Sequence, residues 1–247
     1  VLVNALPDMP RDIPVISLSK GLEKGSRMRM TEIIRDVSPH CIPGVLTGPN
    51  LAREIVAGQA AASVLALEAH DAALALQPTL NNGLFRVYTN QDVVGCELGG
   101  VLKNIIAIAV GMGDGLGAGD NTRAALITRG LAEMSRLGEA LGGKAETFAG
   151  LAGMGDMIAT CTSPQSRNRH VGMELAKGRS IEDIIDSMHM VAEGVKSAPT
   201  VIELAREIGI SLPISEDVYR VITGESNARG VYRGLLRVTA GAESEPG

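Results

Sequence analysis

The most constraining feature of this chain is an apolar segment over residues 99–110, which reads Gly-Gly-Val-Leu-Lys-Asn-Ile-Ile-Ala-Ile-Ala-Val. Because it is apolar nearly all round, the segment predicts a helix buried inside a domain rather than one lying on its surface. One lysine, Lys103, interrupts it. A buried ammonium needs a carboxylate partner or a cavity, or it gives up its proton. The alternative is a lysine at the start of the helix whose stem packs and whose head reaches water.

Composition narrows the class of protein. The 247 residues are 45% hydrophobic but only 2% aromatic, with no tryptophan, so aliphatic side chains must fill the core. With 30 glycines, this usage favours helices that pack closely together. The formal net charge of −5 argues against a protein that binds nucleic acid without regard to sequence.

The cysteines and the apolar runs bear on compartment and metal binding. Cys41, Cys96 and Cys161 lie far apart and form no CxxC pair, so neither a disulfide framework nor a zinc site is expected. No other metal-ligand spacing occurs, and we expect no metal. We expect no membrane span, since no apolar run approaches the roughly 20 residues required. No signal segment opens the chain, and we expect a cytoplasmic protein.

Strand and helix patterns alternate through residue 89. Apolar runs predict strands at 13–18, 45–47, 60–67 and 85–89, with helices at 27–37, from 51 onward and at 70–80. This alternation is typical of an α/β domain with a mostly parallel sheet. After residue 92 the periodic segments are all helical, at 94–110, 121–141, 166–177, 180–188, 197–208 and 212–223.

The change of pattern predicts two domains with a boundary near Asn90. Residues 1–90 form part of a Rossmann-type dinucleotide-binding domain, residues 91–240 an all-α substrate and catalytic domain, and residues 241–247 a disordered tail. No G-x-G-x-x-G turn precedes the strand at residue 13, so we expect the first half of the Rossmann-type domain, about 80–100 residues, to be absent from this sequence. Whether the protein itself lacks that half stays open.

Two candidate positions lie in the α/β region. Lys20 follows the first strand, and ligands of open α/β sheets bind outside the carboxyl ends of strands. The alternative is a lysine that is merely exposed in a turn. Gly48-Pro49-Asn50 precedes a helix, brings the backbone close to a neighbour, and offers Asn50 as an N-cap.

Other candidates lie in the helical region. Asp156 sits in a glycine-rich run, where it either caps a turn or pairs with Lys103 and orients it. The sequence Ser-Arg-Asn-Arg at 166–169 begins a helix and suits an anion, because free N–H groups, a hydroxyl, an amide and guanidiniums converge there. An ordinary solvated helix turn is the alternative. Glu193, in the run 191–195, is an acid able to accept hydrogen bonds from ribose or amide groups.

Seven motifs together resemble the bacterial NAD(P)-dependent glycerol-3-phosphate dehydrogenases. The resemblance extends from about Ile16 to about Arg229, in the family's order. The motifs are ISLSKGLE, TGPNLAREI, ELGGVLKNIIAIAVGM, NTRAALITRGLAEM, GLAGMGDMIATCT, QSRNR and VAEGV.

The resemblance implies hydride transfer between NAD or NADP and C2 of dihydroxyacetone phosphate, which yields sn-glycerol 3-phosphate for phospholipid synthesis. Apart from the resemblance, we expect a homodimer formed through the helical domain and, from the net charge, no nucleic-acid partner. By motif, Lys103 resembles the catalytic general acid/base and Asp156 its charged partner. Positions that resemble substrate contacts are Lys20, Gly48, Asn50, Lys103, Asn104, Asp156, Thr160, Ser166, Arg167 and Asn168. Positions that resemble cofactor contacts are Lys20, Ala52, Arg167, Val191 and Glu193.

Two other interpretations remain at this stage. The chain could be a catalytically silent helical fragment that binds phosphate or a partner, which only the missing glycine motif supports. It could also be a 3-hydroxyacid dehydrogenase with the same two-domain plan and the same buried lysine and asparagine. The Ser-Arg-Asn-Arg sequence favours a substrate that carries a phosphate.

Overall fold

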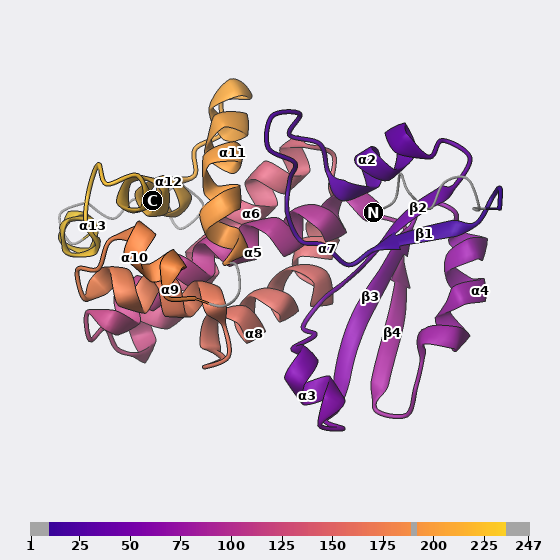
Figure 1. Cartoon of the computed structure of the whole chain (residues 1–247), viewed down its shortest axis with the longest axis horizontal. Helices are drawn as coiled ribbons and strands as arrows, with labels where there is room; N and C mark the ends of the chain where they lie inside the picture. Colours follow the sequence, from indigo (N-terminus) through magenta and orange to yellow (C-terminus); the bar gives the residue numbers. More distant parts are fainter. Residues whose placement is uncertain (1–9, 189–191, 236–247) are drawn as a thin grey trace. The chain divides into compact units, whose positions relative to one another are not determined.

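A computed structural model describes residues 10–188 and 192–235 of the chain (Figure 1). The chain forms two compact units, one of Val1–Gly100 with Gly138–Asp156 and one of Val101–Leu137 with Met157–Gly247. The predicted disordered tail, 241–247, lies outside the described residues.

The first unit is built on a four-stranded sheet in the order β1-β2-β3-β4. The β1–β2 and β3–β4 pairs are parallel, which agrees with the expected mostly parallel sheet, whereas β2 and β3 are antiparallel. At the antiparallel pair, the connection between β2 and β3 contains only a five-residue helix, and the chain turns back along β2 there. The strands are β1 (Pro14–Ser17), β2 (Ile42–Thr47), β3 (Ala61–Leu67) and β4 (Phe85–Asn90).

Both faces of this sheet are covered. On one face Leu65 and Leu67 of β3 pack with Ala73 of the helix α4, which lies beside β4 (Figure 1). On the other face Val64 and Ala66 pack with the first turn of a long helix, α5. The other elements of the unit are α2 (Met30–Val37), α3 (Ala52–Val56), α4 (His70–Leu80), α7 (Ala145–Phe148) and the π-helical turn η2 (Leu151–Gly155).

The helix α5 (Val93–Gly115) contains the apolar segment predicted to be buried, and it is buried. Its first turns pack on the sheet, and the compact units divide at Gly100, inside α5. The domain boundary near residue 90 stays a prediction. By length and composition α5 could cross a membrane, which corrects the expectation that no apolar run is long enough. However, 94% of its most apolar window is buried within the protein, as in the core helix of a globular domain.

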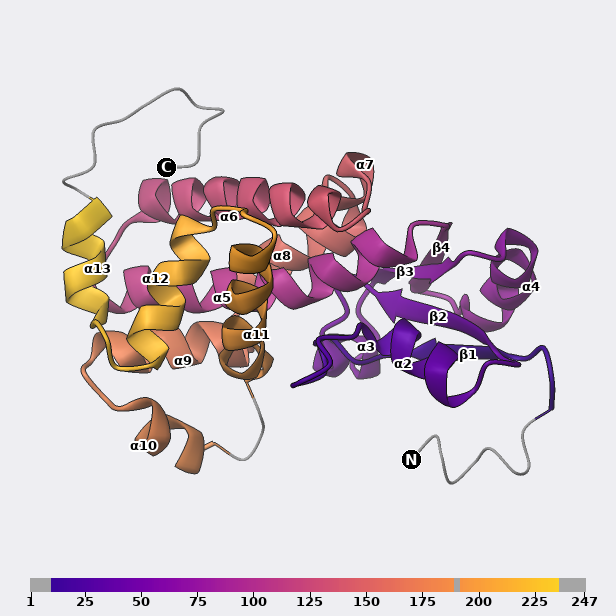
Figure 2. The same ribbon diagram turned by 90° about the horizontal axis from the view of Figure 1, so that it is seen from above.

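The described part of the second unit contains helices and no strand, as the sequence pattern predicted. α6 runs along α5 (Figure 2), and Gly130 of α6 faces Ile106 of α5. The pattern missed α8 and α13 and began α11 four residues late. The helices are α6 (Asp120–Ala140), α8 (Asp156–Thr162), α9 (Arg167–Ala176), α10 (Ile181–Asp186), α11 (Glu193–Glu207), α12 (Pro213–Ile222) and α13 (Ala228–Leu235).

Glycines allow α5 and α9 to approach closely. A Cβ atom added at Gly111 would lie 2.0 Å from the carbonyl oxygen of Arg169, and one added at Gly172 would lie 2.1 Å from that of Ile108. Such distances are impossible for real Cβ atoms, so any larger residue would force the two helices apart. The glycine content therefore fixes the position of α9 against α5.

A buried carboxylate joins α6 to the start of α12. Glu133 is 3% exposed and accepts hydrogen bonds from the backbone N–H groups of Ile214 at 2.5 Å and Ser215 at 3.1 Å. The Ser215 hydroxyl donates a third, at 2.8 Å. These N–H groups belong to the first turn of α12, where helices favour a negative charge. Burial nevertheless raises the pKa of Glu133 above its usual range.

This raised pKa predicts a pH-dependent contribution to stability. The folded chain binds the Glu133 proton more tightly than the unfolded chain, whose pKa is about 4.5. The free energy of unfolding should therefore fall, relative to that of Glu133→Gln, as pH rises from about 4.5 through the raised pKa. Urea titrations from about pH 4 to about pH 7 measure this difference. Glu139→Gln, an exposed change on the same helix, is the control, and parallel curves for wild type and Glu133→Gln would contradict the prediction.

Candidate functional site

In the first unit, polar groups gather at the carboxyl edge of β1 and β2. Lys20 Nζ donates hydrogen bonds to the Gly48 carbonyl oxygen at 3.1 Å, to Asn50 Oδ1 at 3.1 Å and to Asp156 Oδ2 at 2.6 Å. The side chains of Lys20 and Asp156 are only 13% and 3% exposed, so this ion pair is largely shielded from water. Because β1 and β2 are parallel, their carboxyl ends share one edge, where ligands of open α/β sheets bind. We call these four residues the Lys20 cluster.

The loop after β2 has an unusual backbone. Gly48 has φ of +125°, and a Cβ atom there would lie 3.2 Å from the Cα atom of Ser63. Only glycine takes this conformation without strain. The expectation that Asn50 caps α3 is wrong, because the N-cap is Leu51 and no side chain caps that helix. Instead, the Asn50 side chain accepts a hydrogen bond from Lys20 and lies at the carboxyl edge of the sheet.

The residues at this edge fit a dinucleotide. The Gly48 backbone carries no side chain to shield it, and Lys20 supplies a cation beside it. Two hydroxyls close by, Thr47 Oγ1 and Ser63 Oγ, are buried without a hydrogen-bond partner in the described residues. Ala52 is exposed as the first residue of α3. Unshielded backbone and a cation suit the polar groups of a nicotinamide dinucleotide.

In the second unit, Lys103 is 6% exposed, which confirms that the helix buries it. Its Nζ donates a 2.7 Å hydrogen bond to Thr160 Oγ1 of α8, so Thr160 fixes one of the three N–H directions. The family resemblance implies Asp156 as the charged partner of Lys103. Asp156 forms its shielded ion pair with Lys20, and the pairing with Lys103 stays a prediction.

The asparagine after Lys103 belongs to a buried network that joins α5, α9 and α11. Asn168 Nδ2 donates to Asn104 Oδ1 at 2.9 Å, and Asn168 Oδ1 accepts from the backbone N–H of Gly194 at 2.9 Å. Asn104 Nδ2 lies 3.4 Å from Glu193 Oε2. Gly194 is needed here, because a Cβ atom would lie 2.6 Å from the carbonyl oxygen of Asn104. The network holds the start of α11 against α5 and α9 and fixes both amide side chains.

The Ser-Arg-Asn-Arg sequence begins α9 as predicted. Ser166 is the N-cap, and its hydroxyl accepts from the backbone N–H of Arg169 at 3.2 Å. The Arg169 side chain is committed elsewhere, since its Nε donates to Asp114 Oδ2 at 2.7 Å. Arg167 is exposed at the first helical residue. Of the two arginines, Arg167 is therefore the one presented to a solute.

The sequence did not lead us to predict a structural role for Asp114. Its side chain is 6% exposed, and its second oxygen accepts from Arg123 Nη2 at 2.8 Å and Nε at 3.1 Å. It thus ties α6 and the first turn of α9 to the end of α5. The available signal was an acidic residue one helical turn beyond Gly111, on the same side of the apolar helix as Lys103.

Of the remaining predicted positions, Glu193 is the first residue of α11 and is partly buried, while Val191 lies outside the described residues. In the described part of the chain, no group of three His, Cys, Asp or Glu side chains is arranged to hold a metal ion.

The sequence matches the models of one known enzyme family in both regions. Residues 1–73 match the model of the NAD-dependent glycerol-3-phosphate dehydrogenase N-terminus, and residues 92–233 match the model of its C-terminus. The chain belongs to the NAD-dependent glycerol-3-phosphate dehydrogenase family. The Rossmann-like first region and the helical second region are those of this family's fold. The expectation that half of the first domain is absent stays a prediction.

Individual relatives agree with this family assignment. The chain is 68% identical over 235 residues to a glycerol-3-phosphate dehydrogenase [NAD(P)+] of Sphingopyxis alaskensis, covering 95% of this chain and 71% of the relative. It is 52% identical to a glycerol-3-phosphate dehydrogenase [NAD(P)+] of Mycobacterium bovis, and the match covers 98% of this chain and 71% of the relative. Among solved structures, the glycerol-3-phosphate dehydrogenase of Coxiella burnetii matches with a TM-score of 0.91 at 38% identity, covering 96% of this chain and 73% of that one.

The role of Asp114 in this dehydrogenase predicts a large stability difference between two acids that share Arg123. Asp114→Ala should lower the free energy of unfolding by about 3 kcal/mol, because it leaves Arg169, whose side chain is only 18% exposed, without its carboxylate, whereas Arg123 keeps Asp120. Asp120→Ala should cost below about 1 kcal/mol, since Asp120 is 93% exposed. Urea denaturation followed by circular dichroism measures both, and equal losses would contradict the assignment.

Proposed function

We propose that this dehydrogenase transfers hydride between NAD or NADP and C2 of dihydroxyacetone phosphate, forming sn-glycerol 3-phosphate reversibly, with Lys103 as the proton donor. The observation that carries the proposal is a lysine buried in an apolar helix, held by Thr160, one residue before the Asn104–Asn168 network. Family membership supports the reaction and the choice of cofactor.

The chemistry requires a cationic acid at the carbonyl oxygen. The bound cofactor supplies the hydride. As the ketone is reduced, negative charge grows on its oxygen, and an ammonium within hydrogen-bond reach both stabilises that charge and delivers the proton. Lys103 provides these functions in a site from which water is largely excluded. The hydrogen bond to Thr160 holds Nζ in one orientation.

The start of α9 is proposed to bind the substrate phosphate. Arg167 is exposed there, the backbone N–H groups of the first turn point out of the helix, and a guanidinium can grip a phosphate bidentately. Asn168 is held in one orientation by Asn104 and Gly194. Binding the remote phosphate in this way fixes the carbonyl for reaction, which lowers the entropic part of the barrier.

The Lys20 cluster is proposed to contact the cofactor and the substrate. The Lys20 ammonium, balanced by Asp156, lies at the edge of the sheet where dinucleotides bind. Gly48, Asn50 and Ala52 follow β2 at that edge, and Glu193 at the start of α11 is assigned to the rim of the cofactor.

Neither alternative from the sequence is favoured. A silent fragment does not explain why the chain matches both dehydrogenase regions. A 3-hydroxyacid dehydrogenase does not explain the exposed arginine beside a capped helix start, which suits a phosphate.

We extend the proposal to a cytoplasmic homodimer that supplies glycerol 3-phosphate for phospholipid synthesis. The family resemblance supports the part in phospholipid synthesis. The three buried cysteines, which no disulfide links in the described part of the chain, suit a reducing compartment and support the cytoplasmic location.

We expect Lys103→Ala to lower kcat by about 10²–10⁴-fold, because the reaction loses its proton donor, while the affinity for the reduced cofactor changes little. Steady-state oxidation of NADH and NADPH with dihydroxyacetone phosphate measures the first quantity, and quenching of cofactor fluorescence measures the second. Lys196→Ala, an exposed lysine of α11, is the control. Near-wild-type kcat in Lys103→Ala would contradict the catalytic role.

The phosphate role of Arg167 is tested with two substrates. Wild type should prefer dihydroxyacetone phosphate strongly over dihydroxyacetone in kcat/KM. Arg167→Ala should reduce that preference by about tenfold or more, because a charge-assisted hydrogen bond to the phosphate is lost. Most of the change should lie in KM for the phosphorylated substrate. An unchanged ratio between the two substrates would show that Arg167 does not contact the phosphate.

A further inference from the structure

The second unit contains a cavity that the proposed reaction does not use. Its volume is about 430 Å³, within the range typical of small-molecule sites. α6 forms one wall, and the start of α12 with a tyrosine of α13 forms the other. The lining residues are Asn121, Thr122, Ala125, Leu126, Arg129, Glu133, Arg136, Pro213, Ile214 and Tyr232.

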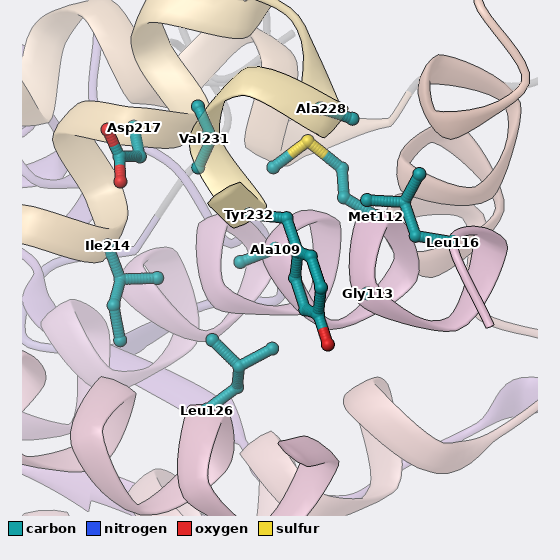
Figure 3. Close-up of a pocket in the computed structure, with 10 residues that line it drawn as sticks. All are labelled: Ala109, Met112, Gly113, Leu116, Leu126, Ile214, Asp217, Ala228, Val231 and Tyr232. Carbon is teal, nitrogen blue, oxygen red and sulfur yellow. The ribbon is translucent and has the colours of Figure 1, made fainter. Parts of the chain in front are cut away.

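A narrow apolar cleft continues this cavity toward α5. Leu126, Ile214 and Tyr232 line both spaces, and Figure 3 shows the ring of Tyr232 between Leu126 and the α5 side chains. On α5 the cleft is lined by Ala109, Met112, Gly113 and Leu116. At about 100° per residue, Met112 lies nearly opposite Lys103 on the helix. The cavity and cleft therefore lie on the side of α5 turned away from the proposed proton donor.

The polar wall of the cavity is positively charged. Arg129 and Arg136 are seven residues apart on α6 and so share one face of it. Arg136 Nη2 donates to the Ser211 carbonyl oxygen at 3.2 Å, but its Nε is buried and has no acceptor among the described residues. A buried donor without an acceptor is costly. Glu133 lies between the two arginines, with its oxygens accepting hydrogen bonds from the first turn of α12.

We propose that this cavity binds an amphipathic anion. Arg136, with Arg129 beside it, holds a carboxylate or phosphate head, and the apolar body lies along Leu126, Ile214 and Tyr232 toward the cleft. The charge of the wall selects an anion, and the apolar lining selects a short alkyl chain over a purely polar ion. The site is a second ligand site, separate from Lys103 and from the start of α9.

Binding to the whole chain can be measured directly, without an activity assay. Isothermal titration calorimetry with octanoate and octyl phosphate, below their micelle concentrations, compares the two head groups at the same chain length. We expect one-to-one binding of at least one of them, weakened about tenfold or more in Arg136→Gln, because a charge-assisted hydrogen bond is lost. Arg53→Gln, an exposed arginine of α3, should leave binding unchanged.

A second pair of variants tests the apolar part of the site without altering the core. Ala125 and Ala124 are both exposed on α6, but only Ala125 lines the cavity. Ala125→Trp should fill the cavity and weaken octyl-chain binding about tenfold or more, whereas Ala124→Trp should not.

Four results would overturn the proposal. The first is equal binding of octyltrimethylammonium, which has the same chain with a cationic head. The second is equal effects of the two tryptophan variants. The third is no binding of either anion at about millimolar concentration. The fourth is a dimer in sedimentation that Ala125→Trp, but not Ala124→Trp, converts to monomer, since the face would then be an interface between copies of this chain.

Discussion

The burial of α5 is the constraint on which the described structure depends. Its residues are apolar nearly all round, so the helix must be covered on every side to keep its surface from water. Its first turns cover one face of the sheet, and its later turns take α6 and α9 against them. Glycines at Gly111 and Gly172 let α9 approach to backbone contact. Only a few arrangements of the neighbouring elements can bury the whole surface of such a helix.

Each polar side chain in this helix is accordingly an anchor or a candidate reactive group. Glu97 accepts hydrogen bonds from Arg29 and Thr31 at the start of α2, and Asp114 accepts them from arginines of α6 and α9. Burial raises the pKa of Glu97, so these hydrogen bonds offset a desolvation cost rather than add free stability. Lys103 donates a hydrogen bond to the Thr160 hydroxyl, and Asn104 accepts one from the Asn168 amide.

How much was predictable differs between elements. The helices α4, α6, α9 and α12 were predicted within one residue or so at their ends, because caps, glycines and apolar periodicity agree there. The turns around Gly150–Gly155 and the helix α8 were not predicted, since glycine-rich sequence has no periodic pattern. The antiparallel β2–β3 pair was missed because the alternation of strands and helices does not report how long a connecting helix must be.

By itself the sequence determined that residues 99–110 form a buried helix and that a helix begins at Ser166, because periodicity and capping are local properties. It left open whether Lys103 is buried or reaches water. It also determined the dehydrogenase family through the order of its motifs. Only the tertiary structure decided that Asp156 pairs with Lys20, that Asp114 holds Arg169, and that Asn168 joins α5 to α11. These partners are far apart in the chain, and the choice among several possible cations and amides depends on how the helices pack.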